Sequence, residues 1–376
     1  MNTIVFLLTS FNRAGAEQQV VQLARGFLAK GWSIHIISMT EPTAPYEELV
    51  RQGIGFEHLD MRRGIPDPRA IMKLRRILNR IKPHIVHSHL VHANLLARAT
   101  RLFTRASMPV LITTAHNSNE GGMLRMLLYR LTDPLCELTT NVSHDAVERF
   151  IQIKAVPRRK IVFIPNGIDS SVFEAARDSA AEDRAAVRAE LGMKDAFIWL
   201  AVGRLTEAKD YPNLLSAFKT AAQTREDCVL LIVGEGELEQ EVMQWIQSHS
   251  LQDKVKQLGI RDDVIRLMRA SDAYVMSSRW EGMPMVLLEA SACGLPIVAT
   301  DAGGNREIVQ SGRSGLIVPP ADSLRLAEAM TAMMALPAAG RAAMGECGRA
   351  YIRQMFDMNV IIERWESIYA RFMEAG

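Results

Sequence analysis

A chain of 376 residues with 48% hydrophobic and 23% charged residues has the composition of a soluble globular protein of two domains. Its four cysteines are scattered without a C-x-x-C pair, which argues against a zinc site or a disulfide framework and favours a reducing compartment. The N-terminal apolar run is too short for a membrane span and has no basic leader. We therefore expect a cytoplasmic protein.

The net charge of +2 conceals an asymmetry between the two halves of the chain. Residues 1–165 carry 22 Lys and Arg against 12 Asp and Glu, a net charge of +10, and the remainder carries −8. This asymmetry suggests that the first half meets an anionic surface or ligand.

The N-terminal half reads as a series of buried strands joined by helices. TIVFLLT (3–9) predicts a buried parallel strand, and a polar turn, a helix ended by Gly31 and the strand SIHIISM follow it. Further strands are expected in 83–89, 109–117, 138–143 and 160–169. Ligands in such sheets bind at the carboxyl ends of the strands, which places Arg13, Gly15 and Glu17 at the mouth of a site.

A basic cluster lies within residues 62–82, and its apolar residues have helical spacing. The helix is expected to be either an ordinary solvated helix or a docking surface for anionic lipid headgroups. Nucleic acid is not expected as a partner, because aromatic residues do not interleave with these charges. The cations of the cluster are Arg62, Arg63, Arg69, Lys73, Arg75, Arg76, Arg80 and Lys82.

Several histidines follow or end the predicted strands. The H-x-H pair His87 and His89 would place both rings on one face of a strand, but no cysteine or carboxylate accompanies them at ligand spacing. We therefore expect no metal site. His116 precedes a polar loop containing Gly121–Gly122 that could close over a ligand, and it is a candidate functional residue.

The second half repeats the alternation of strands and helices. Strands are expected in 228–237, 255–264, 272–278, 296–304 and 315–322, after a first strand that begins near Phe197. The fold class predicted is α/β, with two doubly wound Rossmann-like domains facing each other across a cleft. We expect the first domain in 1–167, the second in 168–355, and a C-terminal helix in 356–376 that crosses back to the first domain.

Two features of the second half suit an anionic ligand. Arg204 and Lys209 lie five residues apart in a turn after a strand and could bind a diphosphate, although each alone could be surface charge. Glu281 lies in the loop before a predicted helix with Pro284 in its first turn, and Glu289 lies about a turn and a half inside that helix, whose free amides and dipole favour anions. The alternative is that Glu281 only caps the helix and Glu289 is a solvated helix residue. Carboxylate, amides and carboxylate in this order suit the hydroxyls and phosphates of a nucleotide-sugar.

The chain resembles the retaining GT-B glycosyltransferases of the family-four group, which build bacterial polysaccharides and glycolipids. The resemblance covers nearly the whole chain. It departs from the family pattern in having Ala14–Gly15 where two glycines are usual, and Met283 and Met285 after Glu281. The matching segments are residues 14–27, TAHN (114–117), IPNGID (164–169), GRLTEAKD (203–210), VGEGE (233–237), GIRDDV (259–264) and 281–309.

The resemblance implies a role for each candidate residue in a metal-independent transfer. Arg204 and Lys209 would bind the donor diphosphate, Glu289 the ribose hydroxyls, and Glu281 the hydroxyls of the transferred sugar. The backbone amides around Gly282, Met283 and Pro284 would contact the donor, and Ile260 and Arg261 would lie beside its base, which is expected to be uracil. Gly15 would let its loop come close to the donor phosphate. His116 would lie near the anomeric centre.

The expected reaction moves a sugar from a nucleotide-sugar, with UDP expected, to a saccharide or lipid-linked saccharide in the synthesis of cell-surface polysaccharide, lipopolysaccharide or capsule. The absence of a D-x-D motif agrees with metal-independent transfer. Glu281 as a covalent nucleophile is a less favoured mechanism. A nucleotide-sugar epimerase of the same architecture is the alternative enzyme, and a catalytically silent binding subunit is the non-enzymatic one.

Overall fold

The computed structural model describes residues 1–12, 14–62, 64–65, 67–104, 109–118, 120–175 and 180–374. Two residues of the sequence predictions, Arg13 and Arg63, lie outside these ranges. The chain divides into two compact units, one made of Met1–Ile168 with Met358–Gly376 and the other of Asp169–Asp357. Within the described residues, no helix has both the length and the apolar composition needed to cross a bilayer.

The first unit is built on a seven-stranded parallel sheet in the order β3-β2-β1-β4-β5-β6-β7. The strands at the centre are fully buried, as expected for parallel strands covered on both faces. Their bounds are β1 Thr3–Leu8, β2 Ser33–Thr40, β3 Gly55–Met61, β4 Ile85–His89, β5 Val110–Ala115, β6 Leu138–Asn141 and β7 Ile161–Phe163.

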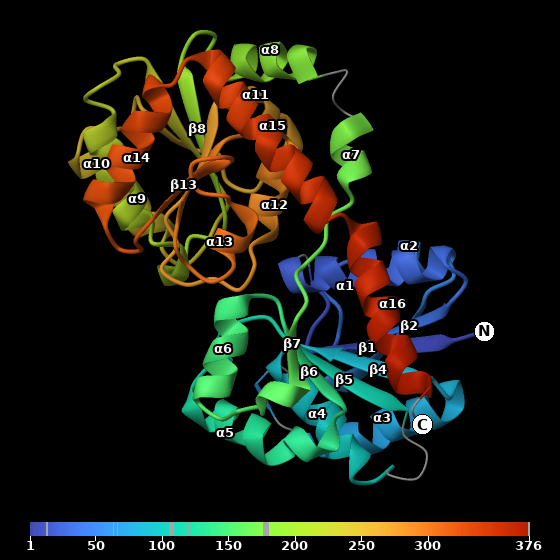
Figure 1. Cartoon of the computed structure of the whole chain (residues 1–376). Coiled ribbons are helices and arrows are strands. Elements are labelled where there is room, and N and C mark those ends of the chain that lie inside the picture. Colours follow the sequence, from blue (N-terminus) through green and yellow to red (C-terminus); the bar gives the residue numbers. More distant parts are fainter. Residues whose placement is uncertain are drawn as a thin grey trace. The chain divides into compact units, whose positions relative to one another are not determined.

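Helices cover both faces of this sheet (Figure 1). One core cluster joins α1 and α16 to alternate residues of the central strands, and another joins α3 and α4 to the residues between them. The helices of this unit are α1 Gly15–Ala29, α2 Glu47–Arg51, α3 Arg69–Ile81, α4 Val91–Arg101, α5 Met123–Thr132, α6 His144–Gln152 and α16 Met358–Glu374, with 3-10 turns η1 Asp133–Leu135 and η2 Arg158–Lys160.

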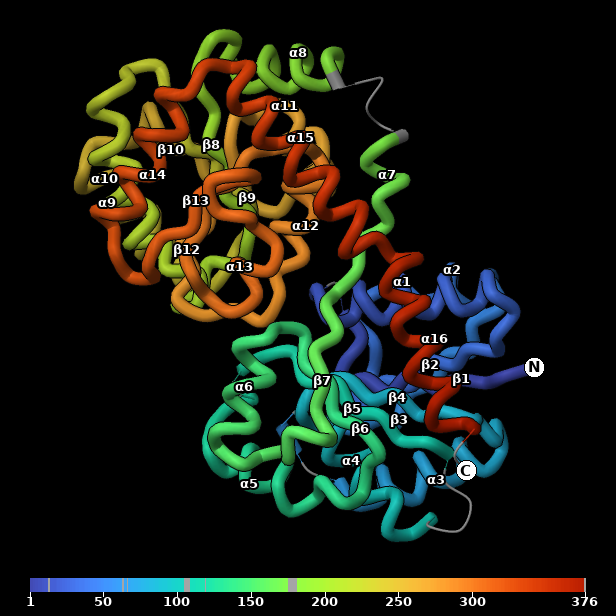
Figure 2. The backbone as a smooth tube through the Cα atoms, in the orientation of Figure 1, coloured from blue at the N-terminus to red at the C-terminus, as the bar shows by residue number. Residues whose placement is uncertain are grey.

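The last helix, α16, belongs to the first unit although it follows the whole of the second in sequence. Its residues Ile361, Trp365 and Tyr369 are buried in the same cluster as Phe27 of α1. The tube in Figure 2 shows α16, in red, running beside α1, in blue. The units change at 168/169 and 357/358, within two residues of the boundaries expected from the sequence.

The second unit contains a six-stranded parallel sheet in the order β10-β9-β8-β11-β12-β13. Its strands are shorter than the segments predicted from the sequence, because each predicted segment also included the loop at the carboxyl end of its strand. The bounds are β8 Phe197–Val202, β9 Cys228–Val233, β10 Val255–Gln257, β11 Ala273–Met276, β12 Ile297–Thr300 and β13 Gly315–Val318.

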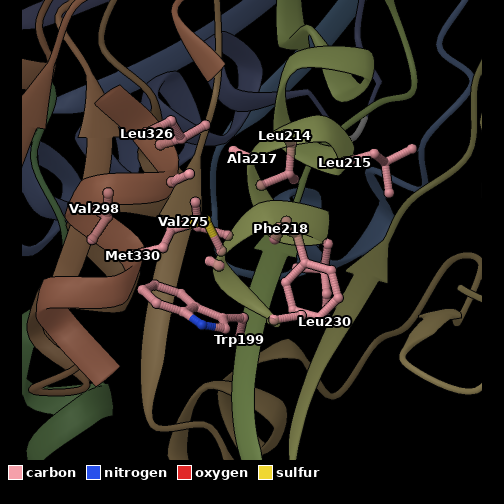
Figure 3. Close-up of a cluster of buried hydrophobic side chains, with 14 of the residues drawn as sticks. Trp199, Leu214, Leu215, Ala217, Phe218, Leu230, Val275, Val298, Leu326 and Met330 are labelled. Carbon is pink, nitrogen blue, oxygen red and sulfur yellow. The ribbon is translucent and has the colours of Figure 1, made fainter. Parts of the chain in front are cut away.

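The core of the second unit packs one face of its sheet against α9 and α14. Trp199 of β8 and Phe218 of α9 lie at its centre, with Leu326 and Met330 from α14 close by (Figure 3). The helices are α7 Ser170–Ala175, α8 Ala180–Glu190, η3 Glu207–Lys209, α9 Tyr211–Ala221, α10 Glu239–Ser248, α11 Val264–Ala270, α12 Met285–Ala292, α13 Asn305–Ile308, α14 Ser323–Ala335 and α15 Ala338–Met355.

Two parallel sheets interleaved with helices confirm the predicted class of two Rossmann-like domains. The sequence analysis missed β3, an edge strand whose segment GFEHLDM alternates polar and apolar residues rather than being uniformly apolar. The predicted helix start at Pro284 was wrong by one residue. Pro284 has an extended backbone with ψ 119° and precedes α12, as a residue flanking a helix does.

Candidate functional site

The order of strands reverses in the second unit between β8 and β11, which are hydrogen-bonded neighbours. The loops that follow these two strands, residues 203–209 and 277–284, therefore leave adjacent carboxyl ends of the sheet. In open α/β sheets this reversal point is where ligands bind. A small pocket at this place is lined by residues that include Lys209, Tyr211, Tyr274, Ser277 and Ser278.

Lys209 and Glu281, which are 72 positions apart in sequence, form an ion pair at this point. Lys209 Nζ donates to Glu281 Oε1 at 2.5 Å, and Ser278 Oγ donates to the same oxygen at 2.7 Å. The side chains of Lys209 and Glu281 are 19% and 13% exposed. The ammonium has three N–H donors, and among the described residues Glu281 accepts from one of them, so two remain for a ligand.

Contacts between the two loops fix the backbone around this pair. Ser277 Oγ donates to the carbonyl oxygen of Lys209 at 2.7 Å, and the amide of Arg279 donates to the carbonyl oxygen of Ala208 at 2.8 Å. Asp210, in the left-handed conformation at φ 50°, accepts a hydrogen bond from Arg279 Nε at 2.9 Å. The ammonium of Lys209 is therefore held by its own loop and by the loop of Glu281.

The loop after β12 approaches the same place so closely that glycine is required. A Cβ on Gly303 would lie 2.3 Å from the carbonyl oxygen of Glu281, and one on Gly304 would lie 2.9 Å from that of Gly282. The Gly304 amide donates to the Gly282 carbonyl at 2.7 Å. Three loops of the second unit thus meet around Glu281 and Gly282.

The residues around the start of α12 differ in burial. Gly282 and Met283 are buried, and Pro284 has no N–H. Met285 and Val286, which are only half-buried, form the first turn of α12, where backbone N–H groups have no partner within the helix. The Met285 amide, next to Pro284, is therefore among the donors at the N-terminus of the helix.

The side chains of Arg204 and Glu289 make no hydrogen bond or ion pair within the described ranges. Arg204 directly follows Gly203 at the end of β8 and is exposed, and no hydrogen bond or ion pair to its guanidinium occurs within the described ranges. Glu289 is the fifth residue of α12, and burial raises the pKa of its carboxyl group above the usual value of 4.5. Arg204 is thus an exposed cation and Glu289 a mostly buried carboxyl group.

The loop after β10 joins the same edge of the sheet through its backbone. The Gly234 amide donates to the Gly259 carbonyl at 2.8 Å, which attaches this loop to the one after β9. Ile260 is 69% exposed. Arg261 is engaged with Asp263, since its Nε donates to Asp263 Oδ1 at 2.8 Å. The structure thus leaves Ile260 open to a ligand and ties Arg261 to a carboxylate.

A buried histidine pair marks the carboxyl edge of the first sheet, whose strand order reverses between β1 and β4. His89 ends β4, and its Nδ1 lies 3.1 Å from Nε2 of His116, which follows β5. Burial lowers the pKa of His116 to about 4 and that of His89 well below its usual range. Both rings are therefore neutral at neutral pH, and His116 offers a ligand a hydrogen bond without a positive charge.

Both ring nitrogens of the third histidine at this edge, His87, are engaged by protein side chains. Its Nδ1 lies 2.7 Å from Tyr369 Oη and its Nε2 lies 2.6 Å from Thr114 Oγ1, so neither nitrogen is open to a metal. Leu90, directly after His89, has a φ of 74°, a strained conformation for a branched residue that is found mostly at functional sites. Across the part of the chain that the structure describes, no three His, Cys, Asp or Glu side chains are grouped to hold a metal ion.

Gly15 and the loop after His116 complete the edge of the first sheet. Gly15 is the first residue of α1 and is exposed. Glu120 Oε1 accepts hydrogen bonds from the amides of His116 at 2.9 Å and Asn117 at 3.2 Å, and burial raises the pKa of its carboxyl group. The buried carboxyl group thus shapes the backbone from which the His116 side chain projects.

Three residues of these sites were not assigned a role from the sequence: Ser278, Glu120 and His89 as the partner of His116. Ser278 stands three residues before Glu281 at a strand end, a spacing that could have suggested the hydrogen bond. Glu120 lies in the same polar loop as His116 and could have been considered there. The pairing of His89 with His116 depends on the alignment of β4 and β5 and has no signal in the sequence.

Comparisons with known proteins cover both units. The model of the glycosyl transferases group 1 matches residues 183–351, and that of Glycosyltransferase Family 4 matches residues 13–172. The UDP-Gal:alpha-D-GlcNAc-diphosphoundecaprenol alpha-1,3-galactosyltransferase of Escherichia coli is 30% identical over 267 residues, which are 68% of this chain and 67% of that protein. A Campylobacter jejuni N-acetylgalactosamine-N,N'-diacetylbacillosaminyl-diphospho-undecaprenol 4-alpha-N-acetylgalactosaminyltransferase is 29% identical over 228 residues, 60% of this chain and 58% of that one.

Solved structures share the architecture at lower sequence identity. Anabaena HepE in complex with UDP-glucose is similar with a TM-score of 0.83 at 22% identity, over 98% of this chain and 99% of that one. A glycosyltransferase from Rickettsia africae has a TM-score of 0.86 at 19% identity over 100% of both chains. At these identities the likeness is one of fold.

Proposed function

The chain belongs to the family-four glycosyltransferases of the GT-B fold, and from that membership we propose that it transfers a sugar from a UDP-sugar to a lipid-linked saccharide, with retention of anomeric configuration and without a metal ion. Glycosyltransferase activity follows from the family, and the donor, stereochemistry and metal independence are the proposal. The main observation that supports the proposal is the Lys209–Glu281 pair, which lies where the strand order of the second sheet reverses.

UDP as the donor nucleotide is supported by relatives and by the site. The Escherichia coli relative is named for UDP-galactose, and HepE was solved with UDP-glucose. Lys209 with its two remaining donors, and exposed Arg204, supply positive charge suited to a diphosphate. Glu289 would accept hydrogen bonds from the ribose hydroxyls, with Ile260 and Arg261 beside the base.

The proposed chemistry is substitution on the same face of the sugar. The acceptor oxygen forms a bond to the anomeric carbon, the bond from that carbon to the UDP oxygen breaks, and the acceptor proton passes to a phosphate oxygen. Lys209, Arg204 and the first-turn amides of α12 are fixed positive groups where negative charge develops. Glu281 already accepts hydrogen bonds from Lys209 and Ser278, which favours a role in binding sugar hydroxyls over one as a nucleophile.

The first unit is proposed to bind the acceptor, with His116 near the reacting carbon and Gly15 close to the donor phosphate. A neutral His116 would act through a hydrogen bond to the sugar rather than through charge, because its pKa is about 4. The names of both relatives given above include a diphosphoundecaprenol or diphospho-undecaprenol acceptor. A lipid-linked acceptor also suits a cytoplasmic protein bound peripherally to the inner face of a membrane.

The basic region of residues 62–82 is proposed to attract that membrane electrostatically. The structure divides its cations into two sets. Arg69, Lys73 and Arg80 pair with Asp67, Asp60 and Glu57. Arg62, Arg75, Arg76 and Lys82 have no carboxylate partner among the described residues and are the cations left to meet lipid phosphates.

The epimerase alternative is not favoured, because the relatives named above are transferases and both family models describe glycosyl transfer. An epimerase would convert the UDP-sugar to its epimer without an acceptor. A transferase without an acceptor would only hydrolyse the UDP-sugar slowly. Incubation of the protein with each UDP-sugar alone distinguishes the two.

The donor assignment is tested by thermal shift and calorimetry with a panel of UDP-, GDP- and ADP-sugars. We expect stabilisation by one UDP-sugar, by about 3 kcal/mol at a hundredfold excess over its dissociation constant. Transfer is then measured with alpha-D-GlcNAc-diphosphoundecaprenol, the acceptor in the name of the Escherichia coli relative, as the first probe. Stabilisation by GDP- or ADP-sugars alone would contradict the proposed donor.

Donor affinity is expected to rise with pH through the pKa of Glu289. Burial raises this pKa above 4.5, so the carboxyl group of the free protein keeps its proton to higher pH. Ribose hydroxyls donate to the ionised form, so donor binding releases this proton and is stronger once pH exceeds the raised pKa. Because this pKa is raised in the folded protein, the free energy of unfolding of the protein without donor falls as pH rises through the pKa of Glu289.

Calorimetry of UDP binding from pH 4.5 to neutrality measures this effect. Glu289→Gln should bind about tenfold more weakly at neutral pH, since hydrogen bonds to a charged group contribute about 1.5 kcal/mol or more. The variant should also lose the rise in affinity with pH. Equal pH profiles for the wild type and Glu289→Gln would show that Glu289 does not contact the donor.

A further inference from the structure

Helix α5 exposes an apolar stripe that nothing in the described structure covers. Five of its ten residues are large apolar side chains with exposed fractions from 37% to 72%. Two others, Met126 and Tyr129, are buried in one cluster with residues of α6 and fasten the helix to the first unit. The stripe consists of Met123, Leu124, Leu127, Leu128 and Leu131.

The stripe is continuous and bordered by cations. At about 100° per residue, its five members fall within an arc of about 140° on the helix. Arg130 borders one edge of the arc, and Arg125 lies beyond the other. The sequence of α5, MLRMLLYRLT, contains no acidic residue. This is an amphipathic helix with an unpartnered apolar face and basic flanks.

A pocket with two cations lies at the C-terminal end of the stripe. It has a volume of about 320 Å³ and is bounded by Arg130 of α5 and by Ile151, Lys154 and Pro157 after it. Arg130 and Lys154 are exposed and have no carboxylate partner within the described ranges. Asp133 also lines the pocket, and its carboxylate is paired with Lys160 at 3.2 Å. The pocket therefore keeps a net positive lining, which suits a phosphate group.

The N-terminal end of the stripe starts beside the proposed acceptor site. Glu120, which holds the amides of His116 and Asn117, also accepts a hydrogen bond at its backbone carbonyl from Arg125 of α5, at 3.0 Å. The stripe thus runs from the His116 loop toward the Arg130 pocket. An apolar chain attached to a saccharide at His116 could continue along α5.

We propose that the α5 stripe inserts into the surface of an anionic bilayer, with Arg130 and Lys154 contacting lipid phosphates. This inference rests on the proposed lipid-linked acceptor. An anionic bilayer fits this surface because Arg130 and Lys154 form no ion pair in the part of the chain that the structure describes, and the apolar residues form a single band. The unpaired cations of α3 add long-range attraction, and α5 supplies the apolar contact.

The experiment measures binding of the full-length protein to vesicles of phosphatidylcholine and of phosphatidylcholine with phosphatidylglycerol at 3:1. The wild type should bind the anionic vesicles, and L124S/L127S/L131S should lower the partition coefficient at least tenfold. A matched control, V172S/M243S/L324S, replaces three exposed apolar residues of the second unit and should bind as the wild type does. R130E/K154E should weaken binding severalfold and reduce its dependence on salt.

Three outcomes would overturn the proposal: no binding of the wild type to anionic vesicles, equal binding by L124S/L127S/L131S, or a wild-type dimer in light scattering that this variant converts to a monomer. The last would make a second copy the occupant of the stripe. UDP-sugar stabilisation of each variant is measured in parallel, so loss of vesicle binding with intact donor binding separates this inference from the proposed function. The same melting curves show that the variants are folded.

Discussion

Lys209→Ala is expected to lower the rate of sugar transfer by about 10²–10³-fold and to abolish stabilisation by UDP-sugars. Among the described residues, Lys209 carries the only ammonium group at the point where the strand order of the second sheet reverses. Its loop is fixed by hydrogen bonds from Ser277 and Arg279. Removing a preorganised positive group from where charge develops on the leaving phosphate typically costs this much. The readouts are UDP release with the lipid-linked acceptor and thermal shift with the donor.

Two comparisons separate a direct role of Lys209 from support of Glu281. Lys219→Ala removes an exposed lysine of α9 in the same unit and should leave both readouts unchanged. In a Glu281→Gln background, Lys209→Ala should still lower the rate strongly if the ammonium acts on the phosphates. No further loss in that background would mean that Lys209 acts only by holding Glu281.

The same assay tests metal independence. Transfer by the wild type should continue at an unchanged rate in EDTA, because Lys209, Arg204 and the α12 amides are proposed to supply all of the positive charge at the diphosphate. A strict requirement for added Mg²⁺ or Mn²⁺ would contradict this part of the proposal.

Asp272→Ala is expected to destabilise the second unit by about 3 kcal/mol, the cost of leaving a buried charge unpaired. Asp272 accepts hydrogen bonds from Arg184 and Arg188 of α8, each at 2.6 Å, and from the Ile198 amide at 2.8 Å. Arg188 is 7% exposed and would lose its counter-charge. The melting temperature of the second unit should fall by about 6–12 °C.

In the calorimetric scan, the transition of this unit is expected to be the one that UDP-sugar shifts to higher temperature. Asp227→Ala provides the matched control, because Asp227 pairs with Arg225 at 2.8 Å but is 55% exposed. Its loss should cost less than about 1 kcal/mol, as for other exposed ion pairs. Equal shifts for the two variants would show that burial of the Asp272 cluster contributes nothing to stability.

The fold could be predicted from the sequence because the central strands are uniformly apolar. Segments such as TIVFLL and CVLLIV can only be buried on both faces, and helices between them require a parallel sheet. β3 was missed because an edge strand does not need to be apolar throughout. The one-residue error at α12 arose because Pro284 suits both the first helical position and the extended residue before it.

The site was less accessible to sequence reasoning, since its decisive contacts join distant segments. Lys209 and Glu281 were each chosen as candidates, but nothing in the sequence shows that one neutralises the other. The same is true of Arg261, whose charge is engaged by Asp263. The α5 stripe is different: its spacing is visible in MLRMLLYRLT, but only the structure shows which side of the helix packs against α6.

The return of α16 to the first unit has a consequence for the order in which the protein is made. The second unit is continuous in sequence and has all its residues as soon as Asp357 leaves the ribosome. The first unit, although it is synthesised first, lacks Trp365 and Tyr369 until α16 emerges, and these fill the core beside Phe27. Domains usually fold in order from the N-terminus, but here the N-terminal sheet keeps apolar surface uncovered until α16, which follows the whole of the second unit, has been made.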